Sequence, residues 1–284
     1  MSYADKLFIE TIKDILGNGE MYPCERGLDA EGNMVYAKWE DGTPAYALGK
    51  FCVINRYDLS KEFPILTLRP VPFKSAVDEI LWIWQKKSNN IKDLKSHIWD
   101  AWADENGSIG KAYGYQLKVK HQYKEGWFDQ VDRIIFDLKN SPHNRRMVTS
   151  LFNHHDLHEM ALYPCAYGME FNVKGGKLNA VLNQRSQDML AANGWNVTQY
   201  AILVHMFAIT AGLQVGELVH KIVDCHIYDK HIDIVKELIT RPQYDAPKLV
   251  INPEVKDFYS FNVEDFKLEG YTTGPQIKGI PIAV

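Results

Sequence analysis

The chain has 284 residues, of which 46% are hydrophobic and 24% are charged, and its formal net charge is -4 at pH 7. This composition is typical of a soluble globular protein, and the negative charge leaves no basic footprint that would make nucleic acid the main ligand. No run approaches the roughly 18 apolar residues of a membrane span, so we expect no membrane partner.

The first half of the chain is predicted to hold three helices and one strand. Apolar residues at three- and four-residue steps predict a helix over Tyr3–Leu16, and turn clusters make residues 18–46 rich in loops. A short strand is predicted over Phe51–Tyr57. The next helix spans Ser75–Gln85, where the first serine is placed to cap the first turn, and another helix spans Phe128–Leu138.

A β-hairpin and an apolar helix are predicted next. The strands Tyr167–Val173 and Leu178–Leu182 flank Gly175 and Gly176, which favour a tight turn. The following helix, Val197–Ala211, is the most apolar segment and is predicted to be central.

The last part of the chain is predicted to form a strand over Glu217–Asp224, a helix over Tyr228–Thr240 and two or three short strands after Pro242. No Gly/Pro/Ser linker divides the sequence. We therefore expect residues 1–284 to form one α+β domain with a mixed or mostly antiparallel sheet.

Cys165 is the candidate nucleophile. If the two strands pair across the Gly-Gly turn, Cys165 and Arg185 lie at the same end of the hairpin, and a guanidinium there lowers the thiol pKa and favours the thiolate. A lone cysteine is more often a small buried hydrophobic residue. The four cysteines have no CxxC spacing, and the N-terminal segment is unlike a signal peptide, so we expect free thiols in a cytoplasmic protein and no zinc site.

Two polar clusters are suited to a phosphate group. Arg145 and Arg146 follow a turn without acidic neighbours, and paired guanidiniums match phosphate oxygens bidentately. Gln184, Arg185 and Ser186 offer an amide, a charge and a hydroxyl within three residues. The alternative for the arginine pair is a solvated loop.

Three further residues, Asn196, His226 and Tyr228, would suit a nucleoside ligand. Asn196 precedes the apolar helix, where it is either an N-cap or an amide that matches both N3–H and O4 of uracil. His226 and Tyr228 share one side of a strand end. They would either bond a ribose hydroxyl or form an ordinary polar pair.

The sequence pattern alone assigns four further residues to the core. Glu79 lies beside the apolar face of its helix and is predicted to be a buried carboxylate with a raised pKa. Tyr113 places a hydroxyl on a glycine-flanked extended segment, and Trp99 and Trp102 would form either a flat wall for a planar cofactor or part of the core.

In combination, these residues resemble the folate-dependent thymidylate synthase family over nearly the whole chain. The most specific signal is Pro-Cys at residues 164–165 with Gln-Arg-Ser-x-Asp at residues 184–188. The other matching segments are residues 79–82, 98–107, 112–114, 145–146, 196, 224–228, 258–261 and 281–284.

The resemblance implies that the substrate is dUMP, the co-substrate is 5,10-methylenetetrahydrofolate, no metal is used, and the products are dTMP and dihydrofolate. Cys165 would attack C6 of the uracil, with Arg185 lowering the thiol pKa. Glu79 and Tyr113 would organise the water network that removes the C5 proton, and Asn196 would bind the edge of the base.

The resemblance also implies two subunits per site. The phosphate would be held by Arg185 and Ser186 together with Arg145 and Arg146 of a second subunit, which makes an obligate homodimer. The family fold is a layered α+β fold whose large twisted mixed sheet packs against the same sheet of the second subunit.

The remaining roles follow from the same resemblance. The other contacts to dUMP would come from Gln184, Asp188, Asn196, His226 and Tyr228. Trp99, Trp102, Asp188 and Ala283 would border the folate, and the C-terminal Ala283-Val284 would close over the filled site.

The sequence departs from the family pattern in four places, one of which is Pro70-Val71-Pro72-Phe73, where members carry a basic or histidine-bearing segment before the helix of Glu79. Ala166 follows the cysteine where most members have histidine, Tyr36 stands in place of an early-loop arginine, and residues 191–195 read Ala-Ala-Asn-Gly-Trp where Leu-Gly-Leu-Pro-Phe is usual. These departures leave two alternatives: a dUMP hydroxymethylase on the same scaffold, in which water replaces the returning hydride, and a catalytically weakened nucleotide-binding homologue.

Overall fold

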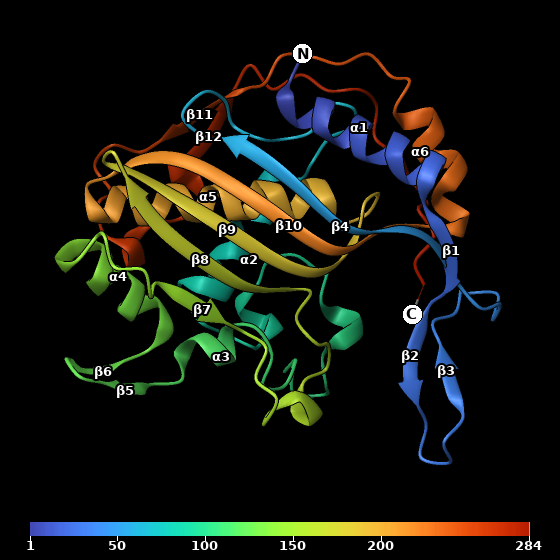
Figure 1. Cartoon of the computed structure of the whole chain (residues 1–284), viewed down its shortest axis with the longest axis horizontal. Helices are drawn as coiled ribbons and strands as arrows, with labels where there is room; N and C mark the ends of the chain where they lie inside the picture. The colour runs from blue at the N-terminus through green and yellow to red at the C-terminus, as the bar shows by residue number, and fades with distance from the viewer. Residues whose placement is uncertain (284) are drawn as a thin grey trace.

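A large mixed sheet forms the centre of the computed structural model, which describes residues 1–283 (Figure 1). Its six strands lie in the order β1 (Glu20–Pro23), β4 (Tyr46–Asp58), β10 (Gln214–Tyr228), β9 (Lys177–Asp188), β8 (Ala166–Lys174) and β7 (Val148–Ser150). Strands β9 and β10 are parallel, and the other neighbouring pairs are antiparallel. The predicted α+β fold with a mixed sheet is confirmed.

The β8–β9 hairpin forms as predicted. Gly175 and Gly176 have φ angles of 55° and 74°, the left-handed values that a two-residue hairpin turn requires, and Lys174 pairs with Lys177. Both strands run further than predicted, and β9 continues through residues 183–188. The extra polar residues keep the ladder because their backbone groups still find partners on β8 and β10.

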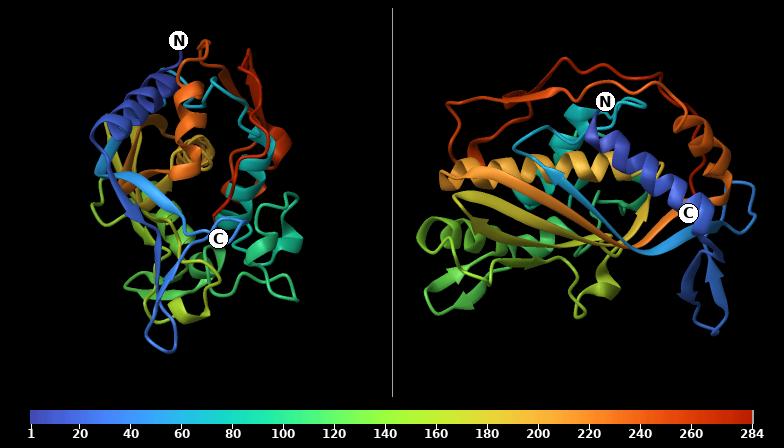
Figure 2. Two further views of the ribbon diagram at one scale, coloured as in Figure 1. Left: turned by 90° about the vertical axis from the view of Figure 1, so that its right-hand side faces the viewer. Right: turned by 45° about the horizontal axis from the view of Figure 1, so that its top comes forward.

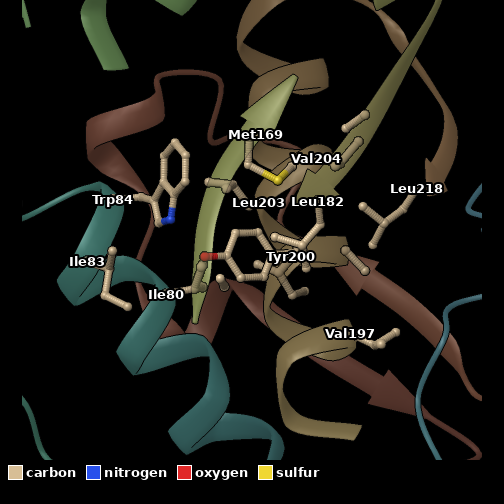
Figure 3. Packing of buried hydrophobic residues seen from close by; sticks show 14 of the residues in the cluster. Ile80, Ile83, Trp84, Met169, Leu182, Val197, Tyr200, Leu203, Val204 and Leu218 are labelled. Atoms are coloured by element: carbon tan, nitrogen blue, oxygen red, sulfur yellow. The ribbon is translucent and has the colours of Figure 1, made fainter. Parts of the chain in front are cut away.

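One face of the sheet is covered by helices, as two further views show (Figure 2). Helix α5 (Asn193–Ala211) lies along this face, and α2 (Phe73–Trp84) packs against α5. In the core, Tyr200 and Leu203 of α5 lie near Ile80 of α2 and Leu182 of β9 (Figure 3). The prediction of a central apolar helix is confirmed.

Several predicted boundaries are wrong. Helix α2 begins at Phe73, directly after Pro72, and Ser75 lies inside the first turn and caps nothing. The reason is that proline, with its fixed φ near -65°, can precede a helix without a side-chain cap. Helix α4 spans Gln130–Asn140 with Asp129 as its N-cap.

Both ends of the chain also differ from the prediction. Helix α1 (Tyr3–Asn18) continues through Gly17. Helix α6 spans only Ile232–Leu238, because β10 extends through Tyr228 and a 3-10 turn intervenes. Two strands after Pro242, β11 (Lys248–Ile251) and β12 (Phe266–Glu269), confirm the predicted tail.

The segment 18–46 contains more structure than predicted. Besides β1, it forms the hairpin of β2 (Glu25–Leu28) and β3 (Met34–Tyr36), which projects from the body (Figure 1). The remaining α-helix and strands are α3 (Gly114–Lys118), β5 (His121–Tyr123) and β6 (Gly126–Phe128), and short 3-10 helices lie between the other elements. Among residues 1–283, no helix is long and apolar enough to cross a membrane.

Candidate active site

A cavity of about 560 Å³ lies where the start of β8 and the ends of β9 and β10 meet α2, the start of α5 and the C-terminal tail. Most residues predicted to carry chemistry line this one cavity. They are Glu79, Trp99, Trp102, Tyr113, Cys165, Gln184, Ser186, Asp188, Asn196, His226, Tyr228 and Ala283.

The three predicted arginines do not line the cavity. Arg145 and Arg146 are exposed in the segment between α4 and β7. Arg185 lies beside the cavity, where its Nη2 is 3.6 Å from Sγ of Cys165, a residue that does line the cavity. Val284, which was expected to help close the site, lies outside the described residues.

Cys165 and Arg185 meet as the hairpin register requires. The backbone N–H of Arg185 donates to the carbonyl of Cys165 at 2.9 Å, and the Arg185 Nη2 lies 3.6 Å from Sγ. The same guanidinium donates to the carbonyls of Pro164 (3.0 Å) and Tyr163 (2.7 Å). These bonds fix the turn that presents the thiol to the cavity.

The predicted lowering of the Cys165 pKa is wrong. Burial raises the pKa of the thiol, and the charge of Arg185 opposes that rise without cancelling it. Ala166, the residue after the cysteine, is buried against the same cavity and contributes only a methyl group. Arg185 therefore offsets part of the cost of ionising a buried thiol.

Glu79 is buried, as predicted, and it is the centre of a shell of donors. Trp99 Nε1 donates to Oε1 at 2.7 Å, while Trp195 Nε1 (2.5 Å) and Gln199 Nε2 (2.7 Å) donate to Oε2. Burial raises the pKa of Glu79, and the three donors oppose the rise. This confirms the predicted direction of the shift.

Tyr113 lines the same cavity as Glu79 and contacts the backbone of Cys165. Its hydroxyl accepts a hydrogen bond from the backbone N–H of Cys165 at 3.3 Å. The residue is not extended as predicted: its φ is 45°, an unusual value for a non-glycine residue, and it precedes α3. A Cβ at Gly114 would lie 2.2 Å from the Ser88 carbonyl oxygen, so only glycine lets the backbone pass here.

Asn196 is not the N-cap of α5, which begins at Asn193, and its amide belongs to a polar chain instead. Gln184 Nε2 donates to Asn196 Oδ1 at 3.2 Å, and Asn196 Nδ2 donates to Gln199 Oε1 at 3.2 Å. Gln184 Oε1 lies 2.8 Å from His220 Nε2. Burial lowers the pKa of His220 to about 3, so this histidine is neutral.

Asp188 marks the side of the cavity next to the tail. Its Oδ1 accepts from the backbone N–H groups of Leu190 and Ala191, and Oδ2 lies 3.7 Å from Nδ1 of His231. Burial raises the pKa of Asp188, but His231 and these donors outweigh burial and lower it overall. His231 Nε2 bonds the Pro281 carbonyl at 2.8 Å, which ties the tail to the site.

The predicted pairing of His226 and Tyr228 at the end of β10 is present. Their rings meet edge-on with centroids 5.0 Å apart. Tyr228 also packs against the small cluster of Ala37, Trp39 and Ala45, where Ala283 of the tail lies as well. Tyr36, on β3, does not line the cavity.

Three residues of this site were missed by sequence reasoning: Trp195, Gln199 and His231. Gln199 follows Asn196 by three residues, so helical spacing alone would have placed both on one face. The donor role of Trp195 carries no comparable signal, because its partner Glu79 is 116 residues away. Within residues 1–283, no group of three or more His, Cys, Asp or Glu side chains could hold a metal ion.

Comparisons with known proteins point to one family. The family model described as thymidylate synthase matches residues 6–284. The thymidylate synthases of Bacillus subtilis subsp. natto and of Bacillus phage phi3T are each 45% identical over 282 residues, which cover 98% of this chain and 98% of each relative. The solved structure of a thermostable thymidylate synthase A from Bacillus subtilis superposes with a TM-score of 0.90 at 44% identity, over 99% of both chains.

Proposed function

The chain belongs to the thymidylate synthase family and converts dUMP to dTMP with 5,10-methylenetetrahydrofolate as co-substrate, and we propose that Cys165 is its nucleophile. The observation that carries this proposal is the position of the thiol: it faces the cavity that Asn196 and Glu79 also line, and Arg185 lies 3.6 Å from its Sγ. Neither the hydroxymethylase alternative nor the weakened homologue is favoured by the comparisons.

The proposed chemistry begins with addition of the Cys165 thiolate to C6 of the uracil, which makes C5 nucleophilic. C5 then takes the methylene group from the folate, and Glu79 and Tyr113 organise the water that removes the C5 proton as the folate leaves. The folate returns a hydride to the methylene and becomes dihydrofolate, and elimination of the thiolate from C6 releases dTMP and restores the free enzyme. The folate supplies the one-carbon unit and the hydride. The support for the carboxylate role is the burial of Glu79 within the same cavity.

We propose that the polar end of the cavity binds dUMP. Asn196 would bond the uracil edge, and His226 with Tyr228 would hold the 3′-hydroxyl. Arg185, Ser186 and Gln184 would contact the phosphate side. These groups come from β9, α5 and β10, whose ends converge on the cavity.

The folate is proposed to occupy the side nearer the tail, and the residues there suit it. Trp99 and Trp102 offer an aromatic wall to a planar ring, and Asp188 is a partly buried carboxylate whose lowered pKa keeps it able to accept N–H donors. Ala283 would cover the filled site. The cavity volume lies within the range of small-molecule sites.

We propose that two chains share each site, with Arg145 and Arg146 supplied by the partner to the phosphate. Both arginines are exposed, and neither lines the cavity of its own chain. Two strands of the sheet carry large exposed apolar side chains, namely Phe51 (83% exposed) and Ile54 (54%) on β4 and Val148 (57%) on β7. Such a surface is suited to a self-complementary interface.

We place this one-domain enzyme in the cytoplasm, in keeping with its four free cysteines.

The decisive test is a product assay. The protein is incubated with dUMP and methylenetetrahydrofolate, dihydrofolate is followed by absorbance, and the nucleotide is identified by mass. We expect dTMP and dihydrofolate in equal amounts; hydroxymethyl-dUMP without dihydrofolate would favour the hydroxymethylase. Cys165→Ser should abolish turnover while dUMP still binds.

A subunit-mixing experiment tests the shared site. Cys165→Ala and Arg146→Glu chains are each expected to be inactive. Mixing them should restore part of the activity, because one hybrid site then has both an intact thiol and an intact arginine. Exchange of subunits without any recovery would reject the supply of arginines from the partner.

A further inference from the structure

We propose that Trp195 is a positioning residue for Glu79, whose indole N–H holds the carboxylate ionised and leaves one acceptor position, on Oε1, for the catalytic water. This inference rests on the role proposed above for Glu79. It adds a residue that the family pattern does not predict, since phenylalanine is usual at that place and has no N–H.

The donor count around Glu79 supports this assignment. A carboxylate has about four lone-pair positions, two on each oxygen. Oε2 accepts from both Trp195 and Gln199, and Oε1 accepts from Trp99 alone. The vacant position on Oε1 is therefore the one that remains for a water molecule.

The chemistry of the donors favours the ionised form. An indole N–H only donates, so neither Trp99 nor Trp195 can accept a proton from a neutral carboxyl group. Gln199 is also fixed as a donor, because its Oε1 already accepts from Asn196. A proton on Glu79 fits only at the open position of Oε1, because both positions on Oε2 face donors, and there it would exclude the hydrogen bond from the catalytic water.

The other groups around Glu79 make these donors necessary. Burial raises its pKa, and Asp78 on the same helix raises it further. The facing tyrosines, Tyr113 beside α3 and Tyr200 on α5, also have raised pKa values and remain neutral phenols. The three N–H groups therefore carry the stabilisation of the anion.

The start of α5 holds Trp195 in place. A Cβ at the preceding Gly194 would lie 2.8 Å from Leu66 Cδ1 and 3.3 Å from Val71 Cγ2, so the helix is seated closely against this segment. This close packing fixes the backbone that carries Trp195, and the side chain is held by the bond from its Nε1 to Oε2 of Glu79.

The test is the pH dependence of kcat for Trp195→Phe, measured from pH 5.5 to 9 at saturating substrates. Loss of one hydrogen bond to a charged acceptor is expected to move the acid limb upward by about one pH unit. Turnover at a pH below the acid limbs of both proteins should fall about tenfold, while at pH 9 it should stay within about twofold of the wild type.

A matched control separates this effect from general loss of packing. Trp82, on the same helix as Glu79, donates its indole N–H to the Asn90 carbonyl at 2.9 Å, so Trp82→Phe should lower stability without moving the acid limb. Trp195→Gln keeps an N–H donor and should retain the wild-type limb. If the Phe variant fails to fold, Trp195→Leu serves as the donor-free member of the pair.

Two outcomes would overturn the inference: an unmoved acid limb in the donor-free variant, or an equal loss of kcat at every pH. Glu79→Gln distinguishes this failure from failure of the proposed function. If Glu79→Gln abolishes turnover while Trp195→Phe leaves the limb unmoved, the role of Glu79 stands and that of Trp195 is rejected. If Glu79→Gln retains turnover, the proposed carboxylate role itself falls.

Discussion

Replacing Arg185 with glutamine should suppress ionisation of the Cys165 thiol. At a separation of 3.6 Å and an effective dielectric constant of about 20, Coulomb's law gives about 4.6 kcal/mol between the two charges. Arg185 is partly exposed, so solvent reduces this, and about 1.5–3 kcal/mol, the usual value of a hydrogen bond to a charged group, is a better measure.

The corresponding assay is alkylation of Cys165 by iodoacetamide, followed by mass spectrometry of its peptide. The loss of 1.5–3 kcal/mol lowers the thiolate fraction about 10- to 100-fold at pH 8. Each remaining thiolate becomes more nucleophilic as its pKa rises, which offsets about half of that loss on a logarithmic scale. The alkylation rate relative to glutathione should therefore fall about 3- to 10-fold.

Arg185→Lys is the control, since it keeps the charge but loses the forked contacts to the carbonyls of Pro164 and Tyr163. It should retain most of the alkylation rate. If the Gln variant alkylates as fast as the wild type, Arg185 does not stabilise the thiolate and its role is confined to the turn and the phosphate.

Two further predictions concern the ends of the cavity. Burial lowers the pKa of His231, but Asp188 and the Pro281 carbonyl raise it overall above 6.5. The stabilisation of the fold by protonated His231 is therefore complete below pH 6.5 and is lost as the pH rises through the folded-state pKa. His231→Gln should lower the free energy of unfolding in urea by about 1.5 kcal/mol at pH 6 and by much less at pH 9. A difference that stays constant with pH would contradict this. Asn196→Asp should change the preferred base from uracil to cytosine by at least about tenfold in kcat/KM, measured with dUMP and dCMP, and an unchanged preference would show that Asn196 does not contact the base.

The hairpin was predictable because its signals are local. Gly175 and Gly176 specify the turn, and the alternation of the strands sets the register, which together bring Cys165 to Arg185. The residues of the site were found through their resemblance to a family, and the cavity gathers most of them. The helix starts were less predictable, because Pro72 replaces a side-chain cap.

The sign of the Cys165 pKa shift was mispredicted for a physical reason. The sequence shows a nearby guanidinium but does not show how deeply the thiol is buried, and burial outweighs the charge. The contact of Trp195 with Glu79 was missed because it joins segments that only the packing of α2 on α5 brings together.

Base recognition and proton transfer are joined by one directional chain of hydrogen bonds. Gln184 donates through Nε2, so its Oε1 must accept, and neutral His220 must carry its proton on Nε2. The same order of donor to acceptor continues from Gln184 to Asn196, from Asn196 to Gln199 and from Gln199 to Glu79. An aspartate at position 196 would face the carbonyl oxygen of Gln199 and would force that amide to turn, which removes a donor from Glu79. For this reason the Asp variant should process dCMP more slowly than the wild type processes dUMP, and substitutions at 196 and 79 should not be additive.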